Sequence, residues 1–272
     1  MKLSAPVQKR LLQYTDFFFD KRPQPFPGEA RLRTCKIVSH RGEHDNIAIY
    51  ENSIQAFDLA LERGIWGIEF DVRWTKDLHP VVIHDPDLKR VFKLDLKICE
   101  LTRKELNSLC PAIPSLCEVI QKYSKKLHLM VEIKAESYPD PQQQNKIFND
   151  CFAGLEPEVD FHLLSLTPEM FDQITFVPAS AFLLVATLNL NQLSELAFVK
   201  GYGGVAGHYL LLTNAILAKH RKKGQKVGTG YPGSKNCLFR EINRGIEWIF
   251  SNNAGELQAV ISRLSSKTRF ER

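Results

Sequence analysis

Three acidic residues stand in two hydrophobic runs of this 272-residue sequence. Glu69 and Asp71 are two positions apart in the run 66–72, so in a β-strand their side chains share one face. Glu132 lies in a second run, 127–134, on an adjacent strand roughly 5 Å away. Buried carboxylates this close repel one another, so we expect them to be protonated or to bind one divalent cation, with all-oxygen ligation favouring Mg²⁺ or Ca²⁺. The alternative is that Glu69 and Asp71 each pair with a basic residue of a neighbouring strand.

Two basic residues belong to the same sequence clusters. Arg41 follows the first hydrophobic run, and Lys134 lies two positions after Glu132. Cations beside a metal site predict a pocket for a tetrahedral anion, most simply a phosphate group. The alternatives are an ion pair of Arg41 with Glu51 or Asp71, and a solvated strand end for Lys134.

Two histidines complete the candidate site. His40 ends the first hydrophobic run and His84 ends the third. The other six histidines are weaker candidates for a catalytic role. A single histidine is usually structural, but two that flank one phosphate can divide the work of general base and general acid. An in-line displacement at phosphorus needs acid and base on opposite sides. We therefore interpret His40 and His84 as a catalytic pair.

These residues must be positioned by a parallel β-structure. Nine short runs rich in Val, Ile, Leu and Phe alternate with helical segments, which is typical of a parallel sheet covered by helices. The runs are 36–40, 66–72, 80–84, 127–134, 160–166, 181–187, 203–208, 225–230 and 246–251. Only about eight residues separate Val72 from Val81, too few for a parallel crossover, so the third run must return as an antiparallel hairpin. The other eight runs predict an α/β fold, the (β/α)8 TIM barrel, with its active site at the carboxyl ends of the strands.

Two local features of this scheme can be predicted more finely. If residues 76 and 79 flank the hairpin turn, Asp71 lies opposite His84 and both face the same side of the sheet. Asn52 is expected to cap the helix after the first strand, with Gln55 as its capping-box partner.

The chain is expected to form one domain, 1–272, with an N-terminal extension, 1–35, and an insertion at about 85–113. The extension carries an aromatic patch made of Tyr14, Phe17, Phe18 and Phe19. We expect this segment to form a helix that plugs one end of the barrel. A role as a lid or as a membrane-surface contact is the alternative.

Composition narrows the class of protein. Thirty-six Lys and Arg against 31 Asp and Glu give a mild charge of +5, which argues against a nucleic-acid partner. No apolar run approaches the roughly 20 residues of a membrane span, and residues 1–10 lack the pattern of a secretory signal. The six cysteines show no zinc-binding spacing, so we expect reduced thiols in a cytoplasmic protein. A small-molecule phosphodiester is the expected partner, while a peripheral membrane contact and the oligomeric state stay open.

Residues 36–134 are similar in their motifs to the glycerophosphodiester phosphodiesterase family. The matching residues are His40-Arg41-Gly42, Glu51-Asn52-Ser53, Ala56-Phe57, Gly64, Glu69-Phe70-Asp71-Val72, Thr75, Asp77, Val81-Val82-Ile83-His84-Asp85, Ile113-Pro114-Ser115-Leu116 and Glu132-Ile133-Lys134. The rest of the chain agrees mainly in the rhythm of its strands.

The resemblance implies a TIM barrel with a short insertion that hydrolyses glycerophosphodiesters to glycerol 3-phosphate and an alcohol with a divalent cation. The family's functional positions fall on catalytic His40 and His84, metal-binding Glu69, Asp71 and Glu132, and phosphate-binding Arg41 and Lys134. In such enzymes a substrate hydroxyl can attack first and form a cyclic phosphate, and the sequence leaves that order open.

Two C-terminal segments depart from the family pattern. Gly228-Thr229-Gly230-Tyr231 stands where the family has Trp-Thr-Val-Asn, and Ser251-Asn252-Asn253-Ala254 stands where it has Thr-Asp-x-Pro. These positions shape the alcohol pocket, so the alcohol stays open; Tyr231 and Trp248 either line that pocket or pack in the core. The alternatives are a lysophospholipase D or another phospholipase-type phosphodiesterase on the same barrel, and a barrel that binds a phosphodiester without cleaving it.

Overall fold

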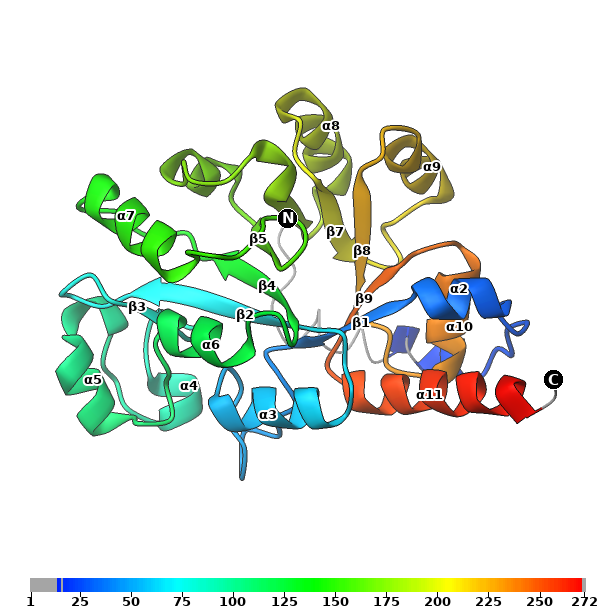
Figure 1. Cartoon of the computed structure of the whole chain (residues 1–272), viewed down its shortest axis with the longest axis horizontal. Helices are drawn as coiled ribbons and strands as arrows, with labels where there is room; N and C mark the ends of the chain where they lie inside the picture. Colours follow the sequence, from blue (N-terminus) through cyan, green and yellow to red (C-terminus); the bar gives the residue numbers. More distant parts are fainter. Residues whose placement is uncertain (1–13, 16, 271–272) are drawn as a thin grey trace.

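Eight parallel strands close into a barrel at the centre of the computed structural model, which describes residues 14, 15 and 17–270 and side chains as far as residue 264 (Figure 1). The strands are β1 (Lys36–His40), β2 (Gly67–Trp74), β3 (Pro80–Val82), β4 (His128–Ile133), β5 (Phe161–Ser165), β6 (Phe182–Ala186), β7 (Gly204–His208), β8 (Lys226–Gly230) and β9 (Trp248–Ser251). Their order is β1-β9-β8-β7-β6-β5-β4-β2-β3, and pairing of β1 with β2 closes the ring. The antiparallel β3 stands outside the ring beside β2. The predicted TIM barrel is confirmed, with all nine strands near their expected bounds.

Helices surround the barrel and connect its strands (Figure 1). They are α2 (Glu29–Thr34), α3 (Ile54–Glu62), α6 (Leu116–Tyr123), α7 (Pro141–Cys151), α8 (Leu190–Lys200), α9 (Asn214–Lys222), α10 (Lys235–Asn243) and α11 (Ala254–Phe270). Between β5 and β6 the chain forms only two short 3-10 helices, Pro168–Gln173 and Ala179–Ala181. The insertion forms α4 (Lys89–Phe92), a 3-10 turn at Ile98–Glu100 and α5 (Arg103–Leu109) around a small hydrophobic core of its own.

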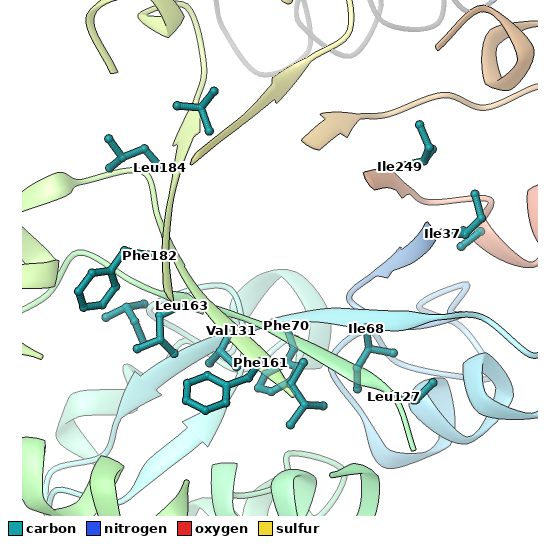
Figure 2. Packing of buried hydrophobic residues seen from close by; sticks show 14 of the residues in the cluster. Ile37, Ile68, Phe70, Leu127, Val131, Phe161, Leu163, Phe182, Leu184 and Ile249 are labelled. Carbon is teal, nitrogen blue, oxygen red and sulfur yellow. The ribbon is translucent and has the colours of Figure 1, made fainter. Parts of the chain in front are cut away.

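The alternation of side chains along β2 determines which of its residues reach the barrel interior. Ile68 and Phe70 are fully buried in the core between strands and helices, where Phe70 packs on Phe57 of α3 at a centroid distance of 5.7 Å (Figure 2). Burying an apolar side chain of this size contributes about 1.5–3 kcal/mol, so this face of β2 is fixed. Because the period of a strand is two, Glu69 and Asp71 point to the opposite face, into the barrel.

The predicted hairpin is present, but its predicted register is wrong by one residue. Val72 pairs with Val82 and Trp74 with Pro80, so Ile83 rather than His84 lies opposite Asp71. The turn holds three residues between Thr75 and His79 rather than the two expected, with Leu78 at a φ of 57°. His84 still reaches the interior because β3 ends at Val82 and strand alternation no longer constrains the residues after it.

The predicted helix cap at Asn52 is also wrong. The Ser53 hydroxyl caps α3 by accepting a hydrogen bond from the amide of Ala56. Asn52 has a φ of 58° and its side chain donates to Asp71 Oδ2 at 2.9 Å. This asparagine is therefore one position before the cap and is part of the barrel's polar interior.

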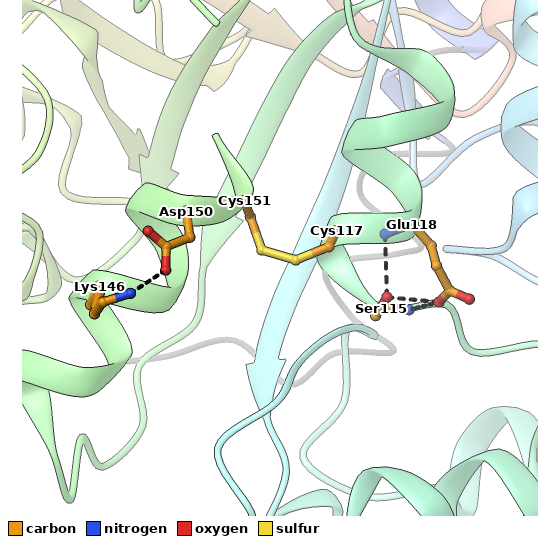
Figure 3. The surroundings of a disulfide bond; sticks show 6 residues. All are labelled: Ser115, Cys117, Glu118, Lys146, Asp150 and Cys151. Atoms are coloured by element: carbon orange, nitrogen blue, oxygen red, sulfur yellow. Dashed lines mark hydrogen bonds and ion pairs between the residues drawn. A yellow bond between two sulfur atoms is a disulfide. The ribbon is translucent and has the colours of Figure 1, made fainter. Parts of the chain in front are cut away.

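Two of the six cysteines are joined, contrary to the expectation that all are reduced. A disulfide between Cys117 and Cys151 links α6 to the end of α7 (Figure 3). The described free thiols are Cys35, Cys99, Cys110 and Cys237. Disulfides are uncommon in cytosolic proteins, so the cysteines no longer support the predicted cytoplasmic location. Among the described residues, no helix has the length and apolar character needed to cross a bilayer.

Part of the N-terminal extension lies at the mouth of the barrel, whereas its helix α2 (Glu29–Thr34) precedes the amino end of β1 and packs on α10 and α11. Thr15 lines the cavity at the carboxyl ends of the strands, and Phe19 packs edge-on against Tyr209 at 5.9 Å. Tyr14 and Phe17 are largely exposed. The expected plug helix falls partly on residues 1–13 and 16, which lie outside the described residues, and it stays a prediction.

Candidate active site

The carboxylates predicted to share a metal ion lie side by side. In the barrel register, β1 His40 is the partner of β2 Glu69, and β2 Asp71 is the partner of β4 Glu132. Oxygen atoms of Glu69, Asp71 and Glu132 all lie within 4.8 Å of one another, and all three residues are buried. This separation lets one small cation contact all three groups.

The pKa values of the three carboxylates are shifted in different directions by burial and by the neighbouring charges. Burial raises the pKa of Glu69 well above its usual value, and repulsion from Asp71 and Glu132 raises it further. Burial also raises the pKa of Glu132, with Lys134 opposing and Asp71 reinforcing the shift. Burial would raise the pKa of Asp71 too, but Lys134 and then Arg41 outweigh it and lower that pKa. Glu69 and Glu132 are therefore stabilised either by taking up a proton or by binding a cation.

Arg41 and Lys134 both point into this cluster, and the ion pairs expected as the alternative for Arg41 are present. Arg41 lies 3.0 Å from Glu51 and 3.3 Å from Asp71, and Lys134 Nζ lies 2.6 Å from Asp71 Oδ1 and contacts Glu132. The solvated strand end expected as the alternative for Lys134 is wrong, because its side chain is 11% exposed. Each cation thus neutralises part of the carboxylate charge and stands at the wall of the cavity.

The backbone after β1 explains why Arg41 is followed by glycine. Gly42 has a φ of 78°, and a β-carbon there would come within 2.7 Å of the Cβ of Ala56 at the start of α3. Only glycine fits this approach of the loop to the helix. The turn leaves the amide of Arg41 bonded to Glu69 O at 2.8 Å, so it fixes Arg41 beside the carboxylates.

His40 is held by a neutral partner. Its Nδ1 lies 2.7 Å from Asn252 Oδ1, so Nδ1 carries the proton and donates to the amide oxygen. Its Nε2 faces Glu69 Oε2 at 3.7 Å and the Tyr231 hydroxyl at 3.5 Å. Burial, assisted by Arg41, lowers the pKa of His40 to about 3. The ring is therefore neutral at pH 7, with a lone pair on Nε2 toward the cavity.

His84 is held by a charged partner. Its Nδ1 lies 2.7 Å from Asp85 Oδ1, and Arg90 of α4 donates to Asp85 Oδ2 at 2.5 Å. Arg90 also donates to both oxygens of Glu51, at 2.8 and 2.5 Å, and Glu51 in turn binds Arg41. A chain of alternating charges thus runs from the insertion through Glu51 to the carboxylate cluster.

Four residues of this network were not among the predicted site residues. Asn52 donates to Asp71, Asn252 orients His40, Tyr231 lines the cavity beside His40, and Arg90 supports the partner of His84. The departure of the segment 251–254 from the family pattern could have directed attention to Asn252. Trp248, considered as a lining residue with Tyr231, packs at the amino ends of the strands instead.

A cavity of about 370 Å³ opens at the carboxyl ends of the strands. Six of the seven predicted site residues line it, and the seventh, Asp71, is buried beneath them. The opposite wall, formed mainly by β5 to β9 and the loops after β5, β6 and β7, is apolar and contains Leu164, Leu166, Val185, Ala186, Leu188, Ala206, Leu210, Leu211 and Phe250. The arrangement can bind a phosphate between two imidazoles and place an apolar group on the far wall.

Comparison with known proteins agrees with the family resemblance of the sequence motifs. Residues 40–155 match the model of the glycerophosphoryl diester phosphodiesterase family. A glycerophosphodiester phosphodiesterase of Caldanaerobacter subterraneus is 36% identical over 111 residues, which are 36% of this chain and 45% of that protein. Human glycerophosphodiester phosphodiesterase 1 is 24% identical over 186 residues, 58% of this chain and 55% of the relative. The chain spans about half the length of these curated relatives.

Solved structures share the fold. A glycerophosphodiester phosphodiesterase of Thermotoga maritima superposes with a TM-score of 0.69 and 24% identity, covering 83% of this chain and 98% of that one. A phosphodiesterase of Oleispira antarctica in complex with the product sn-glycerol-3-phosphate gives a TM-score of 0.70 and 20% identity, covering 84% and 96%. The resemblance drawn from the sequence motifs is confirmed.

Proposed function

We propose that this chain belongs to the glycerophosphoryl diester phosphodiesterase family and hydrolyses glycerophosphodiesters to glycerol 3-phosphate and an alcohol. The observation that carries the proposal is the placement of two imidazoles at one cavity together with a cluster of three carboxylates, of which Glu69 and Glu132 line the cavity and Asp71 lies beneath them. A protein that only bound a phosphodiester would need no proton donor and acceptor, so this arrangement favours an enzyme.

The partners of the two histidines suggest different roles. His40 Nδ1 donates to a neutral amide, which leaves Nε2 as an acceptor, so His40 acts as the general base toward the attacking hydroxyl. Burial lowers the pKa of His84, and the Asp85 carboxylate at its Nδ1 opposes that shift by stabilising the imidazolium, so His84 acts as the general acid that protonates the leaving oxygen. Arg41 and Lys134 bind the phosphate oxygens and stabilise the charge that develops on them.

Glu69, Asp71 and Glu132 would hold one divalent cation, either Mg²⁺ or Ca²⁺. Their donor set consists of oxygens only, and two of the three have a raised pKa, which fits a hard cation. When bound, the ion supplies positive charge that neutralises phosphate oxygens.

A substrate panel tests this proposal. Chelator-treated protein is given glycerophosphocholine with Mg²⁺, Ca²⁺ or Mn²⁺, and release of glycerol 3-phosphate is measured. We expect turnover only with metal, and its loss in His40→Ala and His84→Ala at unchanged thermal stability. His79→Ala is the matched control, because His79 lies at the exposed tip of the hairpin. Near-normal turnover in either site variant would show that the assignment of acid and base is wrong.

A second candidate function is favoured by the apolar wall of the cavity. A phosphodiester with a single hydrocarbon chain, as in a lysophospholipid, could place its chain on that wall while its phosphate lies at Arg41 and Lys134. Leu188 stands at the rim and is 61% exposed, so Leu188→Arg should spare the fold. We expect Leu188→Arg to lower kcat/KM for a lysophospholipid and not for glycerophosphocholine, with Val199→Arg on the outer face of α8 as control. Equal effects on both substrates would contradict this candidate.

We also propose a cytoplasmic location for the protein. The Cys117–Cys151 disulfide argues against this location, because disulfides are more typical of an oxidising compartment. Thiol counting on protein taken from its native cells under non-reducing conditions tests it. Six free thiols per chain are expected in a reducing cytoplasm, and four would contradict that location.

A further inference from the structure

A second cavity lies at the opposite end of the barrel. It measures about 610 Å³ and is lined by residues at or near the amino ends of the strands, including Lys36 of β1, His162 of β5, Lys226 of β8 and Trp248 of β9. We call it the basal cavity. Lys36 and His40 are the two ends of β1, so the basal cavity lies about 13 Å along that strand from the catalytic end.

The barrel interior between the two cavities is filled. Val38, Met130, Leu164 and Leu183 form a buried apolar layer there. A ligand in the basal cavity would therefore not contact the residues assigned to catalysis.

Among the described residues, the acidic residue closest to the two lysines of the basal cavity, Lys36 and Lys226, is Glu247. Lys36 Nζ lies 4.6 Å from the centre of the Trp66 ring, and no carboxylate of the described residues forms an ion pair with it. Lys226 Nζ is 3.8 Å from Glu247, at the limit of an ion pair. Of the other acidic residues nearby, Glu158 accepts a hydrogen bond from Ser180 at 2.6 Å.

The positive charges of Lys36 and Lys226 affect the pKa of a histidine inside the barrel. Burial lowers the pKa of His162 to about 3, and His128, Lys226 and Lys36 lower it further. His128 Nδ1 donates to Val159 O at 3.0 Å and its Nε2 accepts from His162 Nδ1 at 2.8 Å, so both rings are neutral. The net charge at this end is therefore carried by lysines rather than by imidazolium groups.

A buried donor at the same place has no partner. Trp248 lines the basal cavity and is 3% exposed, and its indole Nε1 forms no hydrogen bond with any described residue. Buried polar groups are nearly always hydrogen-bonded, so a buried N–H without a partner, in a side chain that lines a cavity, calls for an acceptor. Trp66 and His162 pack around the Trp248 ring at 6.1 and 4.9 Å and hold its orientation.

We propose that the basal cavity binds a small oxyanion of the phosphate class, with Lys36 and Lys226 supplying the positive charge and Trp248 supplying a hydrogen-bond donor. A phosphate-class anion carries several acceptor oxygens, which matches two ammonium groups and one N–H. Inorganic phosphate and a phosphomonoester such as glycerol 3-phosphate share this chemistry. A site of this kind would let an anion influence the barrel without competing for the active site.

Tryptophan fluorescence gives a readout that does not depend on activity. The chain has three tryptophans, and Trp66 and Trp248 both line the basal cavity, so a Trp74→Phe background reports on it alone. Inorganic phosphate, glycerol 3-phosphate and sulfate are titrated at constant ionic strength against chloride. In this background the further substitutions are Lys36→Gln, Lys226→Gln and, as a matched control, Lys200→Gln at the exposed end of α8. Lys134→Ala removes a proposed phosphate ligand of the active site. It therefore shows whether the change in emission comes from the basal cavity or from binding at the active site.

We expect a saturable change in emission with inorganic phosphate, glycerol 3-phosphate or both, unaffected by Lys200→Gln and by Lys134→Ala. Lys36→Gln and Lys226→Gln should each weaken the apparent Kd by about tenfold or more, since each removes a charge-assisted contact. A change that chloride reproduces, an apparent Kd unaltered by either basal substitution, or a response abolished by Lys134→Ala would overturn the proposal. Thermal unfolding of each variant checks that a lost response does not come from a lost fold.

Discussion

The hydrogen bond between His40 and Asn252 makes a prediction about catalysis. Asn252→Ala removes the acceptor that lies 2.7 Å from His40 Nδ1, so the ring loses the contact that fixes its tautomer and orientation. A hydrogen bond to a group that becomes charged contributes about 1.5–3 kcal/mol. Asn252 is exposed, so water replaces part of the bond, and the lower end of this range applies. A loss of about 1.4 kcal/mol corresponds to a kcat lowered about tenfold, with KM little changed.

The pH dependence of kcat/KM separates this role from a purely structural one. In Asn252→Asp the new carboxylate would stabilise the imidazolium and raise the pKa of His40, so the acid limb of the profile should move to higher pH. Asn253→Ala is the matched control, because Asn253 is also exposed but donates to Gly233 O and does not contact His40. If Asn252→Ala retained a kcat within twofold of the wild type, or Asn252→Asp left the acid limb unmoved, the reasoning would be refuted.

Three further predictions concern the insertion, the buried histidines and the disulfide. Arg90→Gln should lower kcat by removing the support of Asp85, whereas Lys89→Gln on the same helix should not; equal steady-state rates would contradict this. His162 has a pKa lowered to about 3, so below pH 6.5 only the unfolded chain binds its proton and the unfolding free energy falls as pH falls. Denaturant titrations of His162→Gln between pH 6 and 4 should therefore show a slope shallower by about 1.4 kcal/mol per pH unit, and an unchanged slope would refute this. Cys117→Ser should lower the unfolding free energy of oxidised protein by up to about 4 kcal/mol, given the 34-residue separation, and a variant as stable as the oxidised wild type would argue against the bond.

The parts of the fold that depend on local periodicity could be predicted from the sequence. The two-residue spacing of Glu69 and Asp71 placed both inside the barrel, and the short connection from Val72 to Val81 required a hairpin. The register of that hairpin could not be predicted correctly, because Leu78 adopts a left-handed conformation and the turn holds three residues. Nothing in a leucine side chain indicates that conformation.

The supporting residues of the site were harder to predict because their contacts are distant in sequence. Asn252 lies 212 positions from His40, and Arg90 lies 39 positions from Glu51. Closure of the barrel brings β9 beside β1 and so determines the first contact, while the fold of the insertion determines the second. Asn52 was misassigned because asparagine is a good helix cap, and only the structure shows that Asp71 competes for its side chain.

Metal occupancy and turnover measured on the same sample test the central claim, that three carboxylates hold one divalent cation between two catalytic imidazoles. Chelated protein is titrated with Mg²⁺ or Ca²⁺ by calorimetry, and hydrolysis of glycerophosphocholine is followed at each point. The account predicts one ion per chain, turnover that rises in proportion to occupancy, and loss of both in Asp71→Asn. Full turnover in metal-free protein, or an unchanged affinity for the ion in Asp71→Asn, would contradict it.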